Sequence, residues 1–194
     1  MKVSREQAAQ HRERILEAAA QRFRERGFDG IGVADLMKEA GLTHGGFYGH
    51  FSSKDDLIAE ACARALAQSL ARWHKVADRA SGDPLSALAG AYLTSSHRDN
   101  PGAGCVLAAL GPDVSRQGPA VRHSVTGYVR SACDLLAKLV PGKSKTARRQ
   151  EAISTWATLV GAIVIARAVD DRALSREILD AGLASVRGLT QTRV

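Results

Sequence analysis

A short segment rich in glycine and aromatic residues constrains the fold more than any other part of this chain. Residues 41–51 read GLTHGGFYGHF, in which Phe47 and Phe51 are four positions apart and would point the same way from a helix. His44 and Tyr48 have the same spacing and would occupy another face. If the segment is helical from residue 44 onward, the glycines at 45, 46 and 49 each cost the helix about 1 kcal/mol relative to alanine. Packing would then have to hold the helix together. Taken alone, the segment fits a short helix and a glycine-rich loop with anchored aromatic rings equally well.

The sequence upstream favours the helix. Residues 33–40 place apolar side chains at helical spacing, and Gly41 fits the position just beyond a helix C-terminus. Thr43 is a suitable N-cap for a following helix. Residues 12–28 read as a further amphipathic helix ended by Gly27. A helix, a three-residue turn and a second helix have the geometry of a DNA-binding helix-turn-helix.

Several short stretches occur here in a fixed order. They are ILEAA at 15–19, Phe23 with Gly27-Phe28, VADL at 33–36, AGLT at 40–43, GGFY at 45–48, HF at 50–51 and KDDL at 54–57. In this combination the chain resembles the TetR family of bacterial transcriptional repressors. The resemblance covers the N-terminal quarter of the sequence. It implies a helix-turn-helix head in residues 1–53 and an effector-binding and dimerisation body in residues 54–194.

The resemblance also implies which residues face DNA. The matching positions are Thr43, His44, Gly45, Gly46, Tyr48, His50 and Lys54. Of these, the last three are expected to bind phosphates, and residues 43–46 to lie nearest base edges. Two departures stand out. Gly32 begins the second helix where the family usually has Thr or Ser, and Gly49 replaces a larger side chain.

Composition agrees with a helical regulator but does not locate its DNA site. The chain has 194 residues, is 45% hydrophobic and lacks runs of β-branched alternation, which favours an all-α fold. Its net charge is +7, yet residues 1–56 hold nine basic and nine acidic side chains, leaving eighteen against eleven for the rest. The overall charge therefore does not identify the DNA-binding surface, and individual Lys and Arg side chains must be considered instead. The candidates are Lys2, Arg5, Arg12 and Lys54.

The body reads as a series of helices, expected at residues 54–80, 84–100, 105–110, 119–140, 146–169 and 175–189. The 105–110 helix is expected to stop at Gly111-Pro112. The resemblance implies dimerisation through the last two helices. The side chains proposed for that interface are Trp156, Val160, Ile163, Leu179, Leu183 and Val186. The alternative is that these side chains are internal core. The longest uncharged stretch, 152–166, has fifteen residues and several hydroxyl groups, so no membrane span is expected.

The cysteines suggest a reducing compartment and one candidate sensor. Cys62, Cys105 and Cys133 are widely spaced, and no Cys or His cluster has metal-ligand spacing, so a cytoplasmic protein without metal or cofactor is expected. Cys105 follows Gly104 at the expected start of a helix, where the helix dipole would make a thiol more reactive. The alternative is that Cys105 is a small buried apolar residue.

These patterns together predict a transcriptional repressor rather than an enzyme. The expected partners are a palindromic double-stranded DNA operator, a second copy of the chain, and an unknown small-molecule or electrophile effector that releases the DNA. No catalytic residues are assigned, because Gly142-Lys143-Ser144 lacks the first glycine of a phosphate-binding loop and no Gly-x-Ser-x-Gly occurs. A helical enzyme or small-molecule carrier that binds no operator is the alternative.

Overall fold

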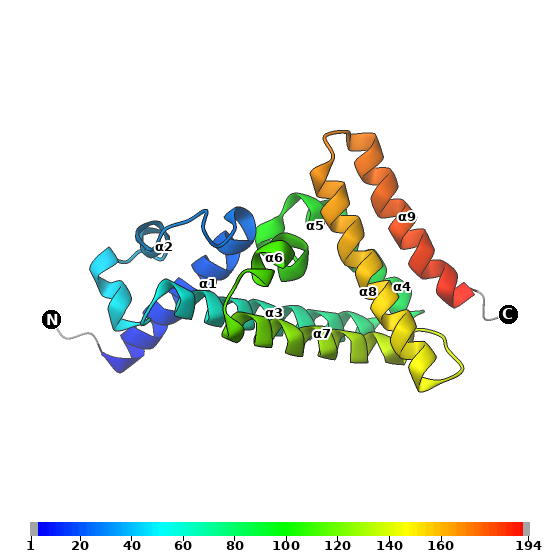
Figure 1. Ribbon diagram of the computed structural model, residues 1–194, viewed down its shortest axis with the longest axis horizontal. Coiled ribbons are helices and arrows are strands. Elements are labelled where there is room, and N and C mark those ends of the chain that lie inside the picture. The colour runs from blue at the N-terminus through cyan, green and yellow to red at the C-terminus, as the bar shows by residue number, and fades with distance from the viewer. Residues whose placement is uncertain (1–3, 192–194) are drawn as a thin grey trace. The chain divides into compact units, whose positions relative to one another are not determined.

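A computed structural model of the chain describes residues 4–191, and in this range it contains helices and no strand, which confirms the all-α expectation (Figure 1). The helices are α1 (Arg5–Arg26), α2 (Val33–Glu39), η1 (His44–Gly49), α3 (Lys54–Arg79), α4 (Pro84–Tyr92), α5 (Ser95–Asp99), η2 (Pro101–Ala103), α6 (Val106–Ser115), α7 (Pro119–Leu139), α8 (Lys145–Ala168) and α9 (Arg172–Gln191). The two η elements are 3-10 helices.

The chain divides into two compact units by its internal contacts. The first combines the described residues up to Leu66 with residues 101–125, and the second combines residues 67–100 with residues 126 onward. Helices α3 and α7 contribute residues to both units. The first unit therefore includes a segment from the middle of the sequence as well as the helix-turn-helix. The functional boundary at residues 53 and 54 stays a prediction.

Helix α1 begins seven residues earlier than the apolar pattern predicts. Ser4 caps it, because the Ser4 hydroxyl accepts from the Gln7 amide at 3.1 Å and the Gln7 side chain accepts from the Ser4 amide at 3.0 Å. This reciprocal pair satisfies two amides that a helix start leaves without partners. The first turns carry few apolar side chains, so periodicity alone missed them. The buried face is the predicted one, with Ile15, Leu16 and Phe23 at 5% exposure or less.

The expected single helix over residues 84–100 is wrong. The structure has two helices, α4 and α5, because the chain leaves helical geometry at Leu93 and Thr94. The Thr94 hydroxyl accepts from the His97 amide at 3.0 Å and so caps a new helix. A threonine that bonds nearby backbone competes with continuation of the preceding helix.

Helix α6 continues through Gly111-Pro112 to Ser115, so the expected stop at this dipeptide is also wrong. A residue before proline normally avoids helical geometry because its Cβ and amide crowd the proline ring. Gly111 has no Cβ, and that relieves part of the conflict.

Helices α8 and α9 pack against each other within the second unit (Figure 1). By length and composition α8 could cross a membrane, since an 18-residue window within its 24 residues has a mean hydropathy of 1.3. The sequence expectation considered only the uncharged stretch and missed this. Leu159 and Ile163 of α8 are fully buried and α8 lies against α9, which is the behaviour of a core helix.

Candidate nucleic-acid interface

The turn between α2 and η1 is fixed by a glycine in the left-handed region. Gly41 has φ of 70°, and its amide donates to the Lys38 carbonyl oxygen at 3.0 Å. The Leu42 amide donates to the Met37 carbonyl oxygen at 2.8 Å. This pair of hydrogen bonds is a Schellman motif, which closes the helix end and turns the chain sharply. The predicted position of Gly41 is confirmed.

Two stacked phenylalanines anchor the segment that follows. Phe47 and Phe51 are 1% and 2% exposed, and their ring centroids are 5.8 Å apart. The segment is a 3-10 helix, a tighter form than the expected α-helix. Thr43 lies at its N-cap position, but the Thr43 side chain makes no capping hydrogen bond. Burial of the two rings therefore holds a segment that its glycines would otherwise destabilise.

The opposite face of η1 is open to solvent. Tyr48 is 70% exposed, and Thr43, His44, Gly45 and Gly46 are exposed as well. A Cβ added at Gly45 or Gly49 would meet no atom within 4 Å. The structure thus brings most of the residues expected at DNA onto one accessible segment, with space for a second surface to approach its backbone.

His50 and Lys54 differ from the exposed residues because both are half-buried. Burial lowers the pKa of His50, and the neighbouring His11 and Arg12 lower it further. The rings of His11 and His50 are 6.1 Å apart. His50 is therefore held toward its neutral form, in which it can donate one hydrogen bond from its ring.

Two capping hydrogen bonds, not predicted from the sequence, hold the start of the helix that carries Lys54. The Ser53 hydroxyl accepts from the Asp56 amide at 3.1 Å, and the Asp56 carboxylate accepts from the Ser52 amide at 3.2 Å. A serine followed three residues later by an acidic residue was the available signal. These bonds fix the first turn of α3, where Lys54 is the first helical residue.

Arg12 has a structural role that its sequence position did not reveal. Its guanidinium is bonded to both carboxylate oxygens of Glu60, at 2.5 and 2.6 Å, and lies over the Phe51 ring at 4.7 Å from the centroid. Arg12 thus ties α1 to α3 and to the buried ring. Arg5 is exposed at the start of α1, and Lys2 lies outside the described residues.

The six side chains proposed for a dimer interface fall into two groups. Trp156, Ile163, Leu179 and Val186 are buried within the chain itself, at 6%, 0%, 3% and 1% exposure. Val160 and Leu183 are half-buried. The first four side chains therefore belong to the internal core, which was the alternative expectation. Contacts within the chain bury them, so no second copy is needed to do so. Other apolar side chains of these helices remain exposed, namely Ile153, Val164, Ile165 and Leu174.

The second unit contains a cluster of aromatic rings. Trp73 and Trp156 lie 4.7 Å apart between centroids, with Tyr92 at 5.6 Å from the first and Tyr128 at 5.9 Å from the second. His97 lies 4.5 Å from Tyr92. The Ser69 and Tyr128 hydroxyls are hydrogen-bonded at 3.1 Å. Both tryptophans of the chain belong to this cluster, which gathers residues from α3, α4, α5, α7 and α8.

The three cysteines are all buried and form no disulfide. Cys105 is the N-cap of α6, so the helix begins one residue later than expected, and Cys105 is 3% exposed. Burial raises the pKa of Cys62 to about 12 and also raises that of Cys133. The low exposure of Cys105 favours its alternative reading as a packing residue.

Sequence comparisons match the part of the chain that holds this interface. The family model described as bacterial regulatory proteins of the tetR family matches residues 15–61. The chain is 33% identical over 89 residues to the HTH-type transcriptional repressor KstR2 of Mycolicibacterium smegmatis, a match that spans 46% of this chain and 43% of that protein. It is 36% identical over 90 residues to the HTH-type transcriptional regulator TtgR of Pseudomonas putida, spanning 44% and 40%. These alignments thus cover less than half the length of each relative.

Similarity of fold extends further along the chain. The crystal structure of Escherichia coli NemR in its reduced form has a TM-score of 0.78 with 24% identity and covers 92% of this chain and 96% of NemR. A TetR regulator from Chloroflexus aurantiacus has a TM-score of 0.79 with 21% identity over 93% and 94% of the two chains. At these identities the structures establish the fold only. The matched N-terminal segment thus places residues 15–61 in the tetR family of bacterial regulatory proteins, and the described chain has the fold of TetR-family transcriptional regulators.

Proposed function

We propose that this protein is a transcriptional repressor that binds a palindromic DNA operator as a homodimer and is released by a small-molecule effector. The observation that carries the proposal is the arrangement of η1. Two buried phenylalanines fix a short segment whose opposite face is exposed, and Tyr48 projects from that face at 70% exposure. The phenol of Tyr48 can donate a hydrogen bond to a phosphate oxygen, as tyrosine side chains do at protein–DNA interfaces. A regulator that binds chromosomal DNA works in the cytoplasm.

The residues of η1 and the start of α3 divide into two roles in this proposal. Tyr48, His50 and Lys54 contact phosphates, because a phenol, an imidazole and an ammonium group can all donate to phosphate oxygens. Residues 43–46 lie nearest base edges, where the two glycines at 45 and 46 allow close approach. The open space at Gly45 and Gly49 supports a tight fit against the duplex.

A dimer is expected because a single small head reads few base pairs. Two heads related by a twofold axis would read half-sites about 34–36 Å apart. Ile153, Ala157, Val160 and Val164 recur every three or four residues along α8, and Leu174, Ile178 and Ala181 do so along α9. All seven are exposed or half-buried. The proposed interface is therefore this exposed apolar face of α8 and α9, which replaces the buried side chains first expected there.

The effector is proposed to bind non-covalently in the second unit, near the aromatic cluster. The cluster supplies flat apolar surfaces together with hydroxyl groups, as small-molecule sites usually do. A covalent electrophile effector at Cys105 is less well supported, since its thiol is buried. Binding to one conformation in preference to another would shift the population away from the DNA-binding state. Helices α3 and α7 continue through both units and are the direct covalent routes for such a change.

The proposal is tested by electrophoretic mobility shift of the purified chain with duplex DNA from upstream of its own gene. A discrete complex that resists excess unrelated DNA is expected, together with a dimer in sedimentation velocity. The absence of any sequence-specific complex with this DNA and with fragments of its genome would rule out the repressor function. Both tryptophans lie in the aromatic cluster, so quenching of intrinsic fluorescence provides a direct screen for effectors.

A further inference from the structure

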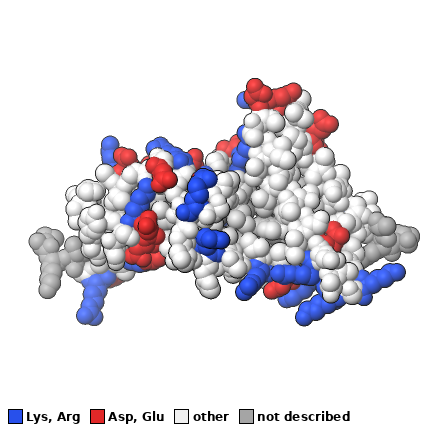
Figure 2. Space-filling model, viewed as in Figure 1, with Lys and Arg blue, Asp and Glu red and all other residues white. Residues whose placement is uncertain are grey.

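A basic groove lies on the second unit between the end of α7 and the first turns of α8. Its volume is about 980 Å³, and Figure 2 shows Lys and Arg side chains gathered on this part of the surface. The lining residues are Asp134, Ala137, Lys138, Val140, Gly142, Lys145, Arg148 and Arg149. The volume lies within the range of about 300–1,000 Å³ that small-molecule sites occupy.

The positive charge of the groove is not balanced by its own residues. Four of the eight lining residues are cations, and the one acid, Asp134, is paired with Arg149 at 2.6 Å. Lys138 and Lys145 are exposed, and neither is in an ion pair with another described residue. Cations that converge on a concave surface repel one another and concentrate anions from solution.

Both guanidinium groups of the groove are held in place before any ligand arrives. Arg149 is fixed by Asp134, and Arg148 donates to the Gly142 carbonyl oxygen at 3.3 Å. Gly142 permits this contact, because a Cβ there would lie 2.7 Å from Cγ of Arg148 and 3.0 Å from its amide nitrogen. Groups that are already ordered lose less freedom on binding, which favours affinity.

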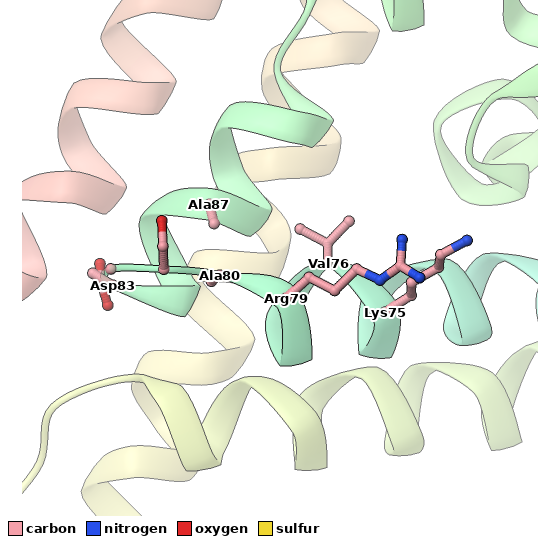
Figure 3. Close-up of a pocket in the computed structure, with 8 residues that line it drawn as sticks. Lys75, Val76, Arg79, Ala80, Asp83 and Ala87 are labelled. Atoms are coloured by element: carbon pink, nitrogen blue, oxygen red, sulfur yellow. The ribbon is translucent and has the colours of Figure 1, made fainter.

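A second hollow on the same unit provides a comparison. It lies between the end of α3 and the start of α4, has a volume of about 510 Å³ and includes Lys75, Arg79 and Asp83 in its lining (Figure 3). Asp83 caps α4 by accepting from the Ser86 amide at 3.0 Å. Figure 3 shows Lys75 and Arg79 projecting from α3 on the side away from Asp83. This hollow has fewer cations, so Lys75 serves as a control position.

We propose that the α7–α8 groove binds a polyphosphorylated small molecule, with Lys138, Lys145 and Arg148 as the groups that contact phosphate. Several anionic groups are needed to match several cations, and phosphate oxygens accept the charge-assisted hydrogen bonds that these side chains donate. The half-buried Ala137 leaves an apolar patch on which an organic portion of the ligand can rest. All residues that line the groove belong to the second unit, whereas the residues proposed to contact DNA belong to the first.

The test is isothermal titration calorimetry on the full chain with sodium tripolyphosphate and, separately, with ATP. The double variant Lys138→Gln with Lys145→Gln is compared with the control Lys38→Gln with Lys75→Gln, whose two lysines are exposed on α2 and α3 and do not line the groove. Each removes two positive charges and lowers the formal net charge from +7 to +5. One saturable site is expected, weakened about tenfold in the groove variant and less than about twofold in the control. Gly142→Ala should also weaken binding, because it displaces Arg148, and circular dichroism checks that each variant remains folded.

Three results would overturn the proposal. The first is the absence of saturable binding of either probe. The second is an equal loss of affinity in the two double variants, which would indicate diffuse charge rather than a site. The third is loss of non-specific duplex DNA binding in the groove variant while tripolyphosphate fails to bind, which would make the groove a nucleic-acid surface. Tighter binding of ATP than of tripolyphosphate would support the proposal and assign a nucleotide.

Discussion

Nε of Arg24 in α1 donates a hydrogen bond of 2.7 Å to the carbonyl oxygen of Gly102 in η2, although the two residues are 78 positions apart in sequence. Arg24 is only 9% exposed. A Cβ built on Gly102 would overlap the carboxylate of Glu25, and it would lie 2.9 Å from Cγ of Gln21. The segment that opens α6 is therefore packed closely onto the first helix of the helix-turn-helix.

This relationship predicts that Gly102→Ala destabilises the protein by about 1–3 kcal/mol, the usual cost of forcing an extra carbon into a filled space. Urea denaturation measures the change. Gly127→Ala is the matched control, since a Cβ at Gly127 meets no atom within 4 Å and alanine favours the α7 helix. Equal stability of the Gly102→Ala variant and the parent would show that this close contact is not maintained in solution.

The exposed face of α8 predicts different fates for two adjacent substitutions. Val164 is 42% exposed and Ile163 is 0% exposed. Val164→Asp should yield a folded monomer, whereas Ile163→Asp should lose its fold, because an unpaired charge in the core costs several kcal/mol. Sedimentation velocity with circular dichroism separates the two outcomes. If the Val164→Asp protein still sediments as a dimer, the dimer interface does not lie on this face of α8.

Burial of Cys105 predicts slow reaction with an alkylating reagent. In the native protein its labelling rate, followed by mass spectrometry, should match those of Cys62 and Cys133 and should rise in all three on unfolding. A sensor thiol would behave differently, with faster labelling of Cys105 and release of DNA after modification. That result would support an electrophile that modifies Cys105 as the effector. Cys105→Ser should retain DNA affinity in either case but lose stability if the thiol is core, because a hydroxyl is costly in an apolar site.

The half-buried His97 predicts a loss of stability in mild acid. Burial lowers the pKa of His97, and its Nδ1 lies 2.8 Å from the Tyr92 carbonyl oxygen. The folded state therefore prefers the neutral ring. Its contribution to stability is present above the unfolded pKa of about 6.5 and is lost as the pH falls through the lower folded value. As the pH falls, the free energy of unfolding should decrease less steeply in His97→Gln than in the parent protein. Identical pH profiles for the two proteins would contradict this assignment.

Local patterns in the sequence were sufficient for the helix-turn-helix. The spacing of Phe47 and Phe51 correctly indicated the buried side of η1, and Tyr48 on the other side is exposed. Gly41 was placed correctly because a helix end needs a positive φ that glycine adopts easily. Both results depend on neighbours within a few residues, which is the range over which sequence patterns are informative.

Long-range packing was not predictable in the same way. The burial of Ile163 beside the exposed Val164 depends on which side of α8 faces its own chain, and both residues are equally apolar in sequence. Arg12 was expected at DNA, but Glu60, 48 residues later, engages it. No local pattern links such pairs. The break at Thr94 and the continuation through Pro112 likewise depended on capping and on the missing Cβ of Gly111.

The most direct test of the account is the salt dependence of DNA affinity in the parent, Lys54→Ala and Tyr48→Phe proteins. Fluorescence anisotropy is measured with one duplex that carries the operator and one that does not. Lys54→Ala should weaken binding to both duplexes and reduce the slope of log affinity against log salt by about 1, the value expected for one lost phosphate contact. Tyr48→Phe should weaken binding to both while leaving that slope nearly unchanged, because it removes a neutral hydrogen bond. Unchanged affinity and slope in both variants would contradict the assignment of η1 and the start of α3 as the DNA-binding surface.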